Sequence, residues 1–272
     1  MSRMQTRLRQ FLAAWPQVAL VKITQARGST PRAVDTWMLV SAGAIFGTIG
    51  GGRLEFMAID RAREMIAQSV VQDRLDVPLG PEIGQCCGGR VVVEIALVDD
   101  DLRAGLPQRI AKMEADYPSV YVFGGGHVGH ALAAVLALLP VHATVVETRP
   151  EALEGMPEGI ATVASAMPET VVREAEKGAA FLVLTHDHAL DFLIVAEALK
   201  RGDAAYVGMI GSKTKKATFS SWFRREADGS AEALAQLICP IGGADVKDKR
   251  PEVIAALAAA ELIRGFAVAD PA

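Results

Sequence analysis

Cysteine is scarce in this chain. Only three of the 272 residues are cysteines, and two of them, Cys86 and Cys87, are adjacent. Three cysteines with this spacing do not form a disulfide framework, which is typical of a protein in the reducing cytoplasm. No apolar run reaches the roughly 18 residues that a membrane-spanning helix needs. The N-terminal segment also lacks the apolar stretch and cleavage site of a secretion signal, so we expect a cytoplasmic protein without membrane contact.

Positive charge is not in excess either. The formal net charge is −4, so bulk electrostatics do not favour binding to nucleic acid. Hydrophobic residues make up 51% of the chain and charged residues 22%, as is typical of a folded globular protein. The length allows two domains. A polar stretch at residues 99–103 marks the expected boundary region, which extends to residue 117.

The strongest local pattern follows an apolar strand at Val120–Phe123. Gly124, Gly126 and Gly129 have the spacing G-x-G-x-x-G and open a helix. In dinucleotide-binding units the first glycine makes a tight turn and the second lets the backbone approach a pyrophosphate. The third lets the helix pack on the strand. The sequence alone therefore predicts an anion site at this helix N-terminus.

The residues that follow support this interpretation. A helix is expected at residues 131–139, and a strand at 142–147 ends on Glu147. Glu147 lies 23 residues after Gly124, close to the roughly 20 expected for a carboxylate that binds a ribose. Further strands near residues 161–164, 180–184 and 204–208 alternate with helices near 168–176, 188–201, 213–226 and 252–264. This alternation predicts a Rossmann-like domain at residues 117–272, with a parallel sheet covered on both faces.

The first half has a different pattern. We expect helices at residues 3–14, 54–69 and 106–116, and strands at 18–24, 37–40, 44–46 and 90–98. Residues 76–89 are predicted to be irregular. Strands and helices that do not alternate regularly indicate a smaller α+β domain at residues 1–103.

The adjacent cysteines lie in a glycine-flanked segment, Cys86-Cys87-Gly88-Gly89. Free cysteine is often simply buried. Adjacent side chains of an extended chain point in opposite directions, however, so at least one thiol should be accessible. Soft thiolates suit soft metals such as zinc, copper or molybdenum. The C-x₂-C pairs of a structural zinc site and the C-x-x-C of a thioredoxin-like site are both absent.

Two further N-terminal loops are candidates for ligand binding. The segment 47–55 has four glycines within six residues, which permits either a plain tight connection or a backbone nest for a phosphate or pterin-like ligand. Arg53 would then supply the opposite charge. The segment 27–32 offers Arg27, Ser29, Thr30 and Arg32, which fit a solvated turn as well as a ligand-binding loop.

Three C-terminal loops also carry polar groups. His186, Asp187 and His188 follow a buried strand, where they could bind a metal, cap the next helix or contact a nucleotide. Ser212 is expected to cap a helix whose free N–H groups, with Lys213, could hold an anion. Residues 240–244 form a glycine-containing loop before the last helix, which could be a plain turn or could line a cleft. No Ser-His-Asp or Cys-His order indicates nucleophilic catalysis.

Taken together, these segments resemble the xanthine dehydrogenase accessory protein family, the XdhC/CoxI-like proteins. The resemblance spans residues 27 to 242 and rests on segments that occur in the same order as in the family. These are residues 27–32, 47–55, 86–89, 122–129, 147–149, 185–188, 206–213 and 240–242.

The resemblance implies a chaperone for molybdenum cofactor. Proteins of this family are understood to bind the cofactor and to protect it while a cysteine desulfurase installs the terminal sulfur. They then insert it into a molybdenum hydroxylase such as xanthine dehydrogenase. A thiol of Cys86 or Cys87 would hold molybdenum, and the loop at residues 47–55 would take the pterin phosphate. The Rossmann-like domain would bind a nucleotide or hold the cofactor between the domains.

A different class of function remains open, namely an NAD(H)-dependent oxidoreductase that uses Gly124–Gly129 and Glu147. A homodimer is expected for so apolar a chain. The residues expected to contact a cofactor are Arg27, Ser29, Gly50, Gly51, Gly52, Arg53, Cys86, Cys87, Gly124, Gly126, His127, Gly129, Glu147, His186 and Lys213.

Overall fold

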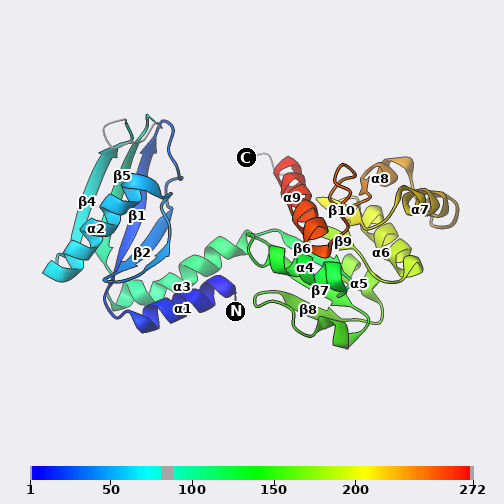
Figure 1. The fold of residues 1–272 in the computed structure, drawn as a ribbon, viewed down its shortest axis with the longest axis horizontal. Helices are drawn as coiled ribbons and strands as arrows, with labels where there is room; N and C mark the ends of the chain where they lie inside the picture. The colour runs from blue at the N-terminus through cyan, green and yellow to red at the C-terminus, as the bar shows by residue number, and fades with distance from the viewer. Residues whose placement is uncertain (1, 81–87, 270–272) are drawn as a thin grey trace. The chain divides into compact units, whose positions relative to one another are not determined.

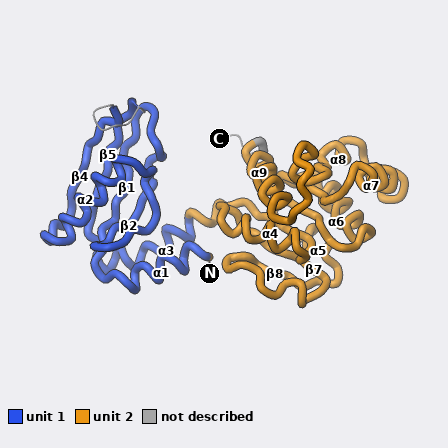
Figure 2. The backbone as a smooth tube through the Cα atoms, in the orientation of Figure 1, with its two compact units in different colours: residues 1, 3–112 blue, residues 2, 113–272 orange. Residues whose placement is uncertain are grey.

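The computed structural model describes residues 2–80 and 88–269. The chain divides into two compact units, residues 3–112 and residues 113–272 (Figure 2). Each unit has its own sheet and its own hydrophobic core. None of the described helices is long and apolar enough to cross a membrane.

The N-terminal unit is built on a five-stranded antiparallel sheet with the order β3-β2-β1-β5-β4 (Figure 1). Its strands are β1 (Val18–Arg27), β2 (Trp37–Ser41), β3 (Ile45–Gly47), β4 (Gln72–Pro78) and β5 (Arg90–Leu97). Its helices are α1 (Arg3–Ala14), α2 (Gly52–Gln68) and α3 (Asp100–Ala115).

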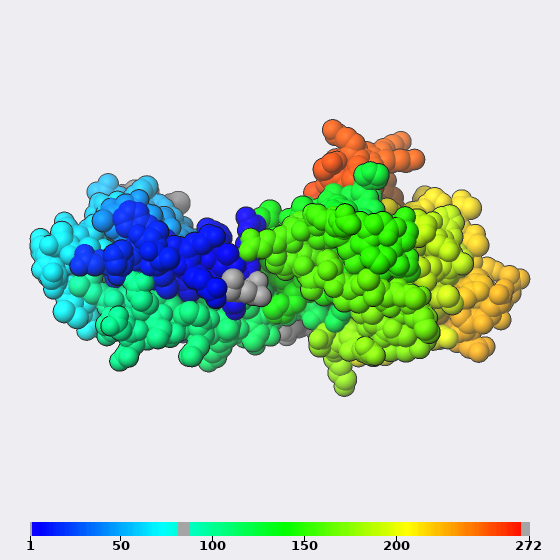
Figure 3. Space-filling view, turned by 90° about the horizontal axis from the view of Figure 1, so that it is seen from below, coloured from blue at the N-terminus to red at the C-terminus, as the bar shows by residue number. Residues whose placement is uncertain are grey.

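Helices cover both faces of this sheet. Side chains of α2 pack on one face, and Leu8 of α1 packs with Leu106 and Ile110 of α3 on the other. The helices α1 and α3 lie side by side (Figures 1 and 3). Because both faces are covered, Val18–Val21 of β1 are all buried, and the apolar run does not alternate with polar residues.

The second unit is a six-stranded parallel sheet with the order β11-β10-β9-β6-β7-β8. Its strands are β6 (Ser119–Phe123), β7 (His142–Glu147), β8 (Ala161–Ala164), β9 (Ala180–Val183), β10 (Tyr206–Met209) and β11 (Leu237–Ile238). Counted along the chain from β6, this is the strand order 3-2-1-4-5-6 of dinucleotide-binding Rossmann domains. The predicted α/β class with a parallel C-terminal sheet is confirmed.

Helices cover both faces of the parallel sheet as well. The helices α4 (His127–Leu136) and α9 (Pro251–Ala269) pack on one face. The other face carries α5 (Pro168–Glu174), α6 (His188–Arg201), α7 (Lys213–Glu226) and α8 (Ala231–Ala235). A short 3₁₀ helix, η2 (Pro150–Leu153), follows β7.

Two sequence-based expectations about local structure are wrong. The irregular segment was expected from Asp76, but β4 continues to Pro78 because it pairs with β5 along its whole length. The polar stretch at 99–103 is the start of α3. There the carboxylate of Asp99 accepts a hydrogen bond from the N–H of Leu102 at 2.8 Å, which satisfies one of the free donors of the first helical turn.

Candidate functional sites

Three of the sequence motifs meet in the N-terminal unit. The loop after β1 lies against the glycine loop before α2, since a Cβ atom at Gly50 would be 2.9 Å from Cβ of Pro31 and 3.1 Å from Cγ of Arg32. The loop after β1 also contacts Gly88 and Gly89. Ser29 forms a parallel bridge with Gly88, and a Cβ atom at Gly89 would be 2.7 Å from the carbonyl oxygen of Arg27.

The segment that ends in Gly88-Gly89 begins with the predicted thiol site. Cys86 and Cys87 lie outside the described residues, so the expectation that they hold molybdenum stays a prediction. The described structure nevertheless brings residues 27–32, 47–55 and 88–89 together, although they are far apart in the sequence.

A carboxylate of the chain already occupies the glycine loop before α2. Glu55 Oε2 accepts hydrogen bonds from the N–H groups of Ile49 at 2.9 Å and Gly51 at 3.1 Å, and from the hydroxyl of Thr48. Partial burial raises the pKa of Glu55, but these hydrogen bonds outweigh it and leave the pKa below its ordinary value. Glu55 therefore holds the loop in shape as an anion.

The surface of this loop assembly is cationic. Arg27, Arg32 and Arg53 are exposed, and their guanidinium groups form no salt bridge with any carboxylate in residues 2–80 and 88–269. A Cβ atom at Gly51 would meet nothing within 4 Å, so the backbone there is open to a ligand. Arg32 packs against Gly50 and Arg53 follows Gly51 by two residues, so cationic groups that suit a phosphate come from both loops.

The glycine loop after β6 packs as the spacing predicts. Gly124 has φ +120°, and a Cβ atom there would be 2.5 Å from the carbonyl oxygen of Leu184, at the end of β9. A Cβ atom at Gly129 would collide with the carbonyl oxygen of Gly124, so the third glycine lets α4 pack closely on β6. A Cβ atom at Gly126 would meet nothing within 4 Å. His127 is exposed at the first position of α4.

Glu147 stands at the expected end of β7, but its carboxylate binds the glycine loop. It accepts hydrogen bonds at 2.8 Å from the N–H groups of Gly125 and Thr148, and the guanidinium of Arg149 lies 3.4 Å away. Burial raises the pKa of Glu147, but the hydrogen bonds from Gly125 and Arg149 outweigh it and lower the pKa to about 2. Contact between Glu147 and a ribose stays a prediction.

The loops after β9 and β10 have mainly structural contacts. Asp187 caps α6 by accepting a hydrogen bond from the N–H of Ala189 at 2.8 Å, and His186 is exposed beside it. Within the described residues no group of three or more histidine, cysteine, aspartate or glutamate side chains could hold a metal ion. Lys213 is exposed at the start of α7, which Ser212 caps as predicted.

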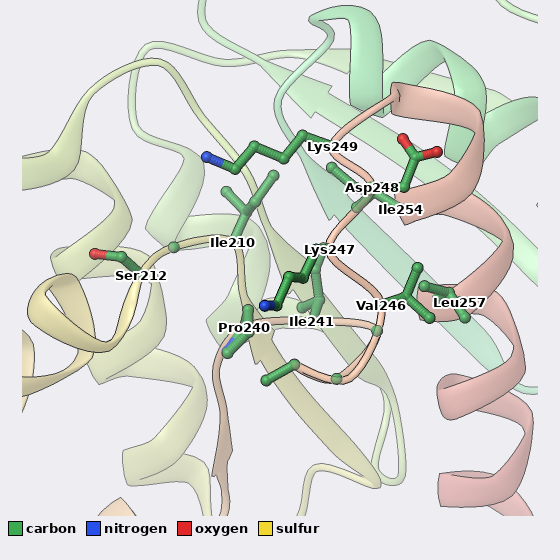
Figure 4. Close-up of a pocket in the computed structure, with 14 residues that line it drawn as sticks. Ile210, Ser212, Pro240, Ile241, Val246, Lys247, Asp248, Lys249, Ile254 and Leu257 are labelled. Carbon is green, nitrogen blue, oxygen red and sulfur yellow. The ribbon is translucent and has the colours of Figure 1, made fainter.

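A pocket opens at the carboxyl ends of β10 and β11, with a volume of about 530 Å³ (Figure 4), and the loop at residues 240–244, for which a cleft-lining role was an open alternative, forms part of it. Its lining includes Ile210–Ser212, the loop at residues 240–244 and residues 246–249. Lys247 and Lys249 were missed because neither residue belongs to a recognisable motif. The signal that could have found them is the charged run Lys247–Arg250 directly after a glycine loop.

These features define a protein with a Rossmann domain that follows an antiparallel α+β unit. Residues 120–262 match the XdhC Rossmann domain, and residues 12–75 match the XdhC and CoxI family. The chain therefore belongs to the XdhC family, as the motifs had predicted.

Two relatives extend these matches. The chain is 26% identical over 258 residues to the protein YqeB of Escherichia coli, which covers 90% of this chain and 43% of YqeB. The chain thus spans less than half the length of that curated relative. Its fold is also similar to the crystal structure of a protein described as a xanthine dehydrogenase from Bacillus halodurans. The TM-score is 0.77 at 18% identity, and the match covers 98% of this chain and 96% of the other.

Proposed function

We propose that this protein binds molybdenum cofactor, protects it during sulfuration and inserts it into a xanthine dehydrogenase-type molybdenum hydroxylase. Membership of the XdhC family suggests a role in the maturation of xanthine dehydrogenase and an interaction with that enzyme. The observation that carries the finer proposal is the meeting of residues 27–32, 47–55 and 88–89 in one place. A cysteine desulfurase as second partner, a homodimeric state and a cytoplasmic location belong to the same proposal.

The residues at this place fit the chemistry of the cofactor. Its phosphate group needs cationic donors, and Arg27, Arg32 and Arg53 are exposed and make no salt bridge within the described residues. A Cβ atom at Gly51 or Gly88 would meet nothing within 4 Å, so a ligand can approach the backbone there, but the N–H of Gly51 donates to Glu55 and that of Gly88 to the carbonyl oxygen of Leu79. When bound, the cofactor would supply the molybdenum centre that the client enzyme needs.

The chain's own residues have distinct roles in this proposal. The arginines bind and orient the phosphate. Glu55 holds the glycine loop in shape, because its carboxylate accepts the N–H groups of Ile49 and Gly51. Cys86 and Cys87, which precede Gly88 in the sequence, offer thiolates for the metal.

The test is retention of the cofactor. The purified full-length protein would be mixed with released molybdenum cofactor, desalted and assayed for molybdenum and for oxidised pterin by fluorescence. We expect stoichiometric retention by the wild type and its loss in the variants Cys86→Ala/Cys87→Ala and Arg32→Ala/Arg53→Ala. Arg9→Ala, an exposed arginine of α1, is the matched control and should retain the cofactor. Full retention by the double cysteine variant would contradict the proposal.

An NAD(H)-dependent oxidoreductase is the second candidate. It is favoured by the complete Rossmann strand order and by the open backbone face of Gly126. The carboxylate of Glu147 counts against it, since it already binds the N–H of Gly125 in the loop that would face a pyrophosphate. Titration of NAD(H) into the protein, with Glu147→Ala as the comparison, tests this candidate. Absence of binding would remove this candidate.

A further inference from the structure

The pocket at the ends of β10 and β11 lies outside the carboxyl ends of these strands, the end of an open α/β sheet that binds ligands, although the topological switch point of this sheet lies between β6 and β9. Its volume of about 530 Å³ falls within the range of small-molecule pockets. Apolar side chains line two of its walls, with Ile210 after β10 on one and Ile254 and Leu257 of α9 on the other. The flat face of a ring system could lie between these walls.

The lining of the pocket also carries positive charge. Lys247 and Lys249 make no salt bridge within the described residues, whereas Asp248 between them pairs with Arg250 through three side-chain hydrogen bonds at 3.1, 2.9 and 2.6 Å. Figure 4 shows the side chain of Lys249 extending towards the side of Ile210 and Ser212 and that of Lys247 extending towards Pro240, while the carboxylate of Asp248 points away. The pocket therefore favours an anion.

Partly buried polar contacts hold the pocket walls in place. Glu261 of α9 accepts hydrogen bonds from the N–H of Gly242 at 2.8 Å and from the hydroxyl of Tyr206 at 2.7 Å. On the facing wall, Lys215 donates to the carbonyl oxygen of Ile210 at 3.0 Å. The N–H groups of Gly211 and Gly243 donate to no acceptor in the described part of the chain, so they remain available to a polar ligand edge.

We propose that this pocket binds a phosphorylated planar heterocycle of mononucleotide size. The phosphate lies between Lys247 and Lys249, and the ring packs against Ile210, Ile254 and Leu257. The N–H groups of Gly211 and Gly243 bind polar atoms at the edge of the ring. This site is separate from the glycine loop after β6, where the carboxylate of Glu147 already binds the N–H of Gly125. It also shares no residue with the cofactor loops of the N-terminal unit.

The experiment compares phosphorylated probes with their matched dephosphorylated forms. AMP, FMN, adenosine and riboflavin would each be titrated into the full-length protein by calorimetry. We expect at least one phosphorylated probe to bind, and its dephosphorylated form to bind at least about 10-fold more weakly, because the lysines lose their charged partner. The double variant Lys247→Ala/Lys249→Ala should weaken binding of the phosphorylated probe by a similar factor. Lys177→Ala, an exposed lysine outside the pocket, is the control and should bind as the wild type does.

A second variant guards against a folding artefact. Val246 lines the pocket and is 43% exposed, so Val246→Asp should fold normally while placing a carboxylate beside the phosphate. We expect it to weaken binding too. The proposal is overturned if neither phosphorylated probe binds at millimolar concentration, if binding is unchanged in the double lysine variant, or if it is lost only in a glycine-loop variant such as Gly126→Ala.

Two sources share this ligand chemistry, a free nucleotide and the pterin phosphate of the cofactor itself. The cofactor retention assay on Lys247→Ala/Lys249→Ala distinguishes them. Unchanged retention, with nucleotide binding lost, assigns the pocket to a second ligand. Lost retention, with the arginine and cysteine variants of the N-terminal unit still retaining the cofactor, assigns it to the pterin phosphate and contradicts the N-terminal site.

Discussion

Lys215 and Asp191 form an ion pair that is withdrawn from water, with side chains 10% and 0% exposed. Asp191 belongs to the first turn of α6 and Lys215 to that of α7. The other carboxylate oxygen of Asp191 accepts hydrogen bonds from the N–H of Thr185 at 3.0 Å and from its hydroxyl at 2.7 Å. Since Lys215 also donates to the carbonyl oxygen of Ile210, the pair ties the loop after β9 to the loop that lines the pocket.

Removing one partner of this pair should destabilise the fold strongly. Asp191→Asn leaves the Lys215 ammonium buried without its charge partner, and we expect a loss of about 3–5 kcal/mol in the free energy of unfolding. The double variant Asp191→Asn/Lys215→Met should cost less than the sum of the single changes, because the two residues are in contact. Urea unfolding of the four proteins measures both quantities.

The control for these variants is an exposed ion pair that also joins an aspartate to a basic residue. Asp248 and Arg250 are paired on the surface, where the arginine side chain is 74% exposed. Asp248→Asn should have little effect on stability because water screens such pairs. An Asp191→Asn variant no less stable than Asp248→Asn would show that the buried pair does not stabilise the fold.

The stability of the second unit should depend on pH through Glu147. Its pKa is lowered from 4.5 to about 2 in the folded protein, so the ionised form is favoured by folding. The stabilisation is fully present above pH 4.5 and is lost as the pH falls towards 2, with a total of about 3 kcal/mol. Glu147→Gln should therefore be less stable than the wild type at pH 7, and the difference should shrink below pH 4.5.

Chemical unfolding at a series of pH values from 7 to about 3 tests this expectation. Glu158→Gln, which removes an exposed carboxylate of the same unit, serves as the control and should leave the pH dependence unchanged. If the difference between wild type and Glu147→Gln were the same at pH 7 and pH 3, the hydrogen bonds to Gly125 and Thr148 would not be the source of the stabilisation.

Substitution by alanine should lower the free energy of unfolding strongly at one glycine of this motif and hardly at all at another. A Cβ atom at Gly129 would collide with the carbonyl oxygen of Gly124. We therefore expect Gly129→Ala to lower the free energy of unfolding by about 1–3 kcal/mol or more. Gly126 has φ −77°, and a Cβ atom there meets nothing within 4 Å. Gly126→Ala should stay within about 0.5 kcal/mol of the wild type. Thermal unfolding of both variants measures the contrast.

Gly126→Ala also reports on ligand binding at the glycine loop. Because this variant keeps its stability, any loss of NAD(H) binding would come from the methyl group that it places beside α4. Unchanged binding of NAD(H) would locate the nucleotide elsewhere. Equal destabilisation by Gly126→Ala and Gly129→Ala would contradict the packing described for this loop.

The sequence predicted the C-terminal fold well because its signals are local. The strand at His142–Glu147 and the helices at His188–Arg201 and Lys213–Glu226 have the predicted bounds. Each has an apolar run or a capping residue that marks its ends. β4 was missed because its polar sequence becomes a strand only through pairing with β5, which local propensity does not report.

The candidate sites could be predicted only in part. The spacing placed Glu147 correctly at the end of β7, but it did not show that its carboxylate would bind the N–H of Gly125. That contact depends on how two loops approach each other in space. The loop at residues 240–244 was a candidate for lining a cleft, but the lysines of the pocket were missed for the same reason, since Ile210, Lys247 and Leu257 meet only when β10 and α9 pack together.

Another pair of glycines tests the loop assembly of the N-terminal unit. A Cβ atom at Gly89 would collide with the carbonyl oxygen of Ser29 and lie 2.7 Å from that of Arg27. Gly89→Ala must therefore push the segment at residues 88–89 away from the loop after β1. If this assembly binds the cofactor, as we propose, the variant should lose most of its cofactor retention. Gly105→Ala is the matched control, because Gly105 lies within α3 and a Cβ atom there meets nothing within 4 Å.

The two variants separate folding from binding. Gly105→Ala should stabilise the protein by about 0.5–1 kcal/mol, because alanine favours the helix more than glycine does. It should retain the cofactor as the wild type does. Gly89→Ala should keep the core of the unit, since Gly89 lies outside both hydrophobic clusters that pack on the sheet. Molybdenum analysis after desalting, together with thermal unfolding, gives both readouts. A folded Gly89→Ala variant with full retention would show that contact between residues 88–89 and 27–29 is not needed for binding.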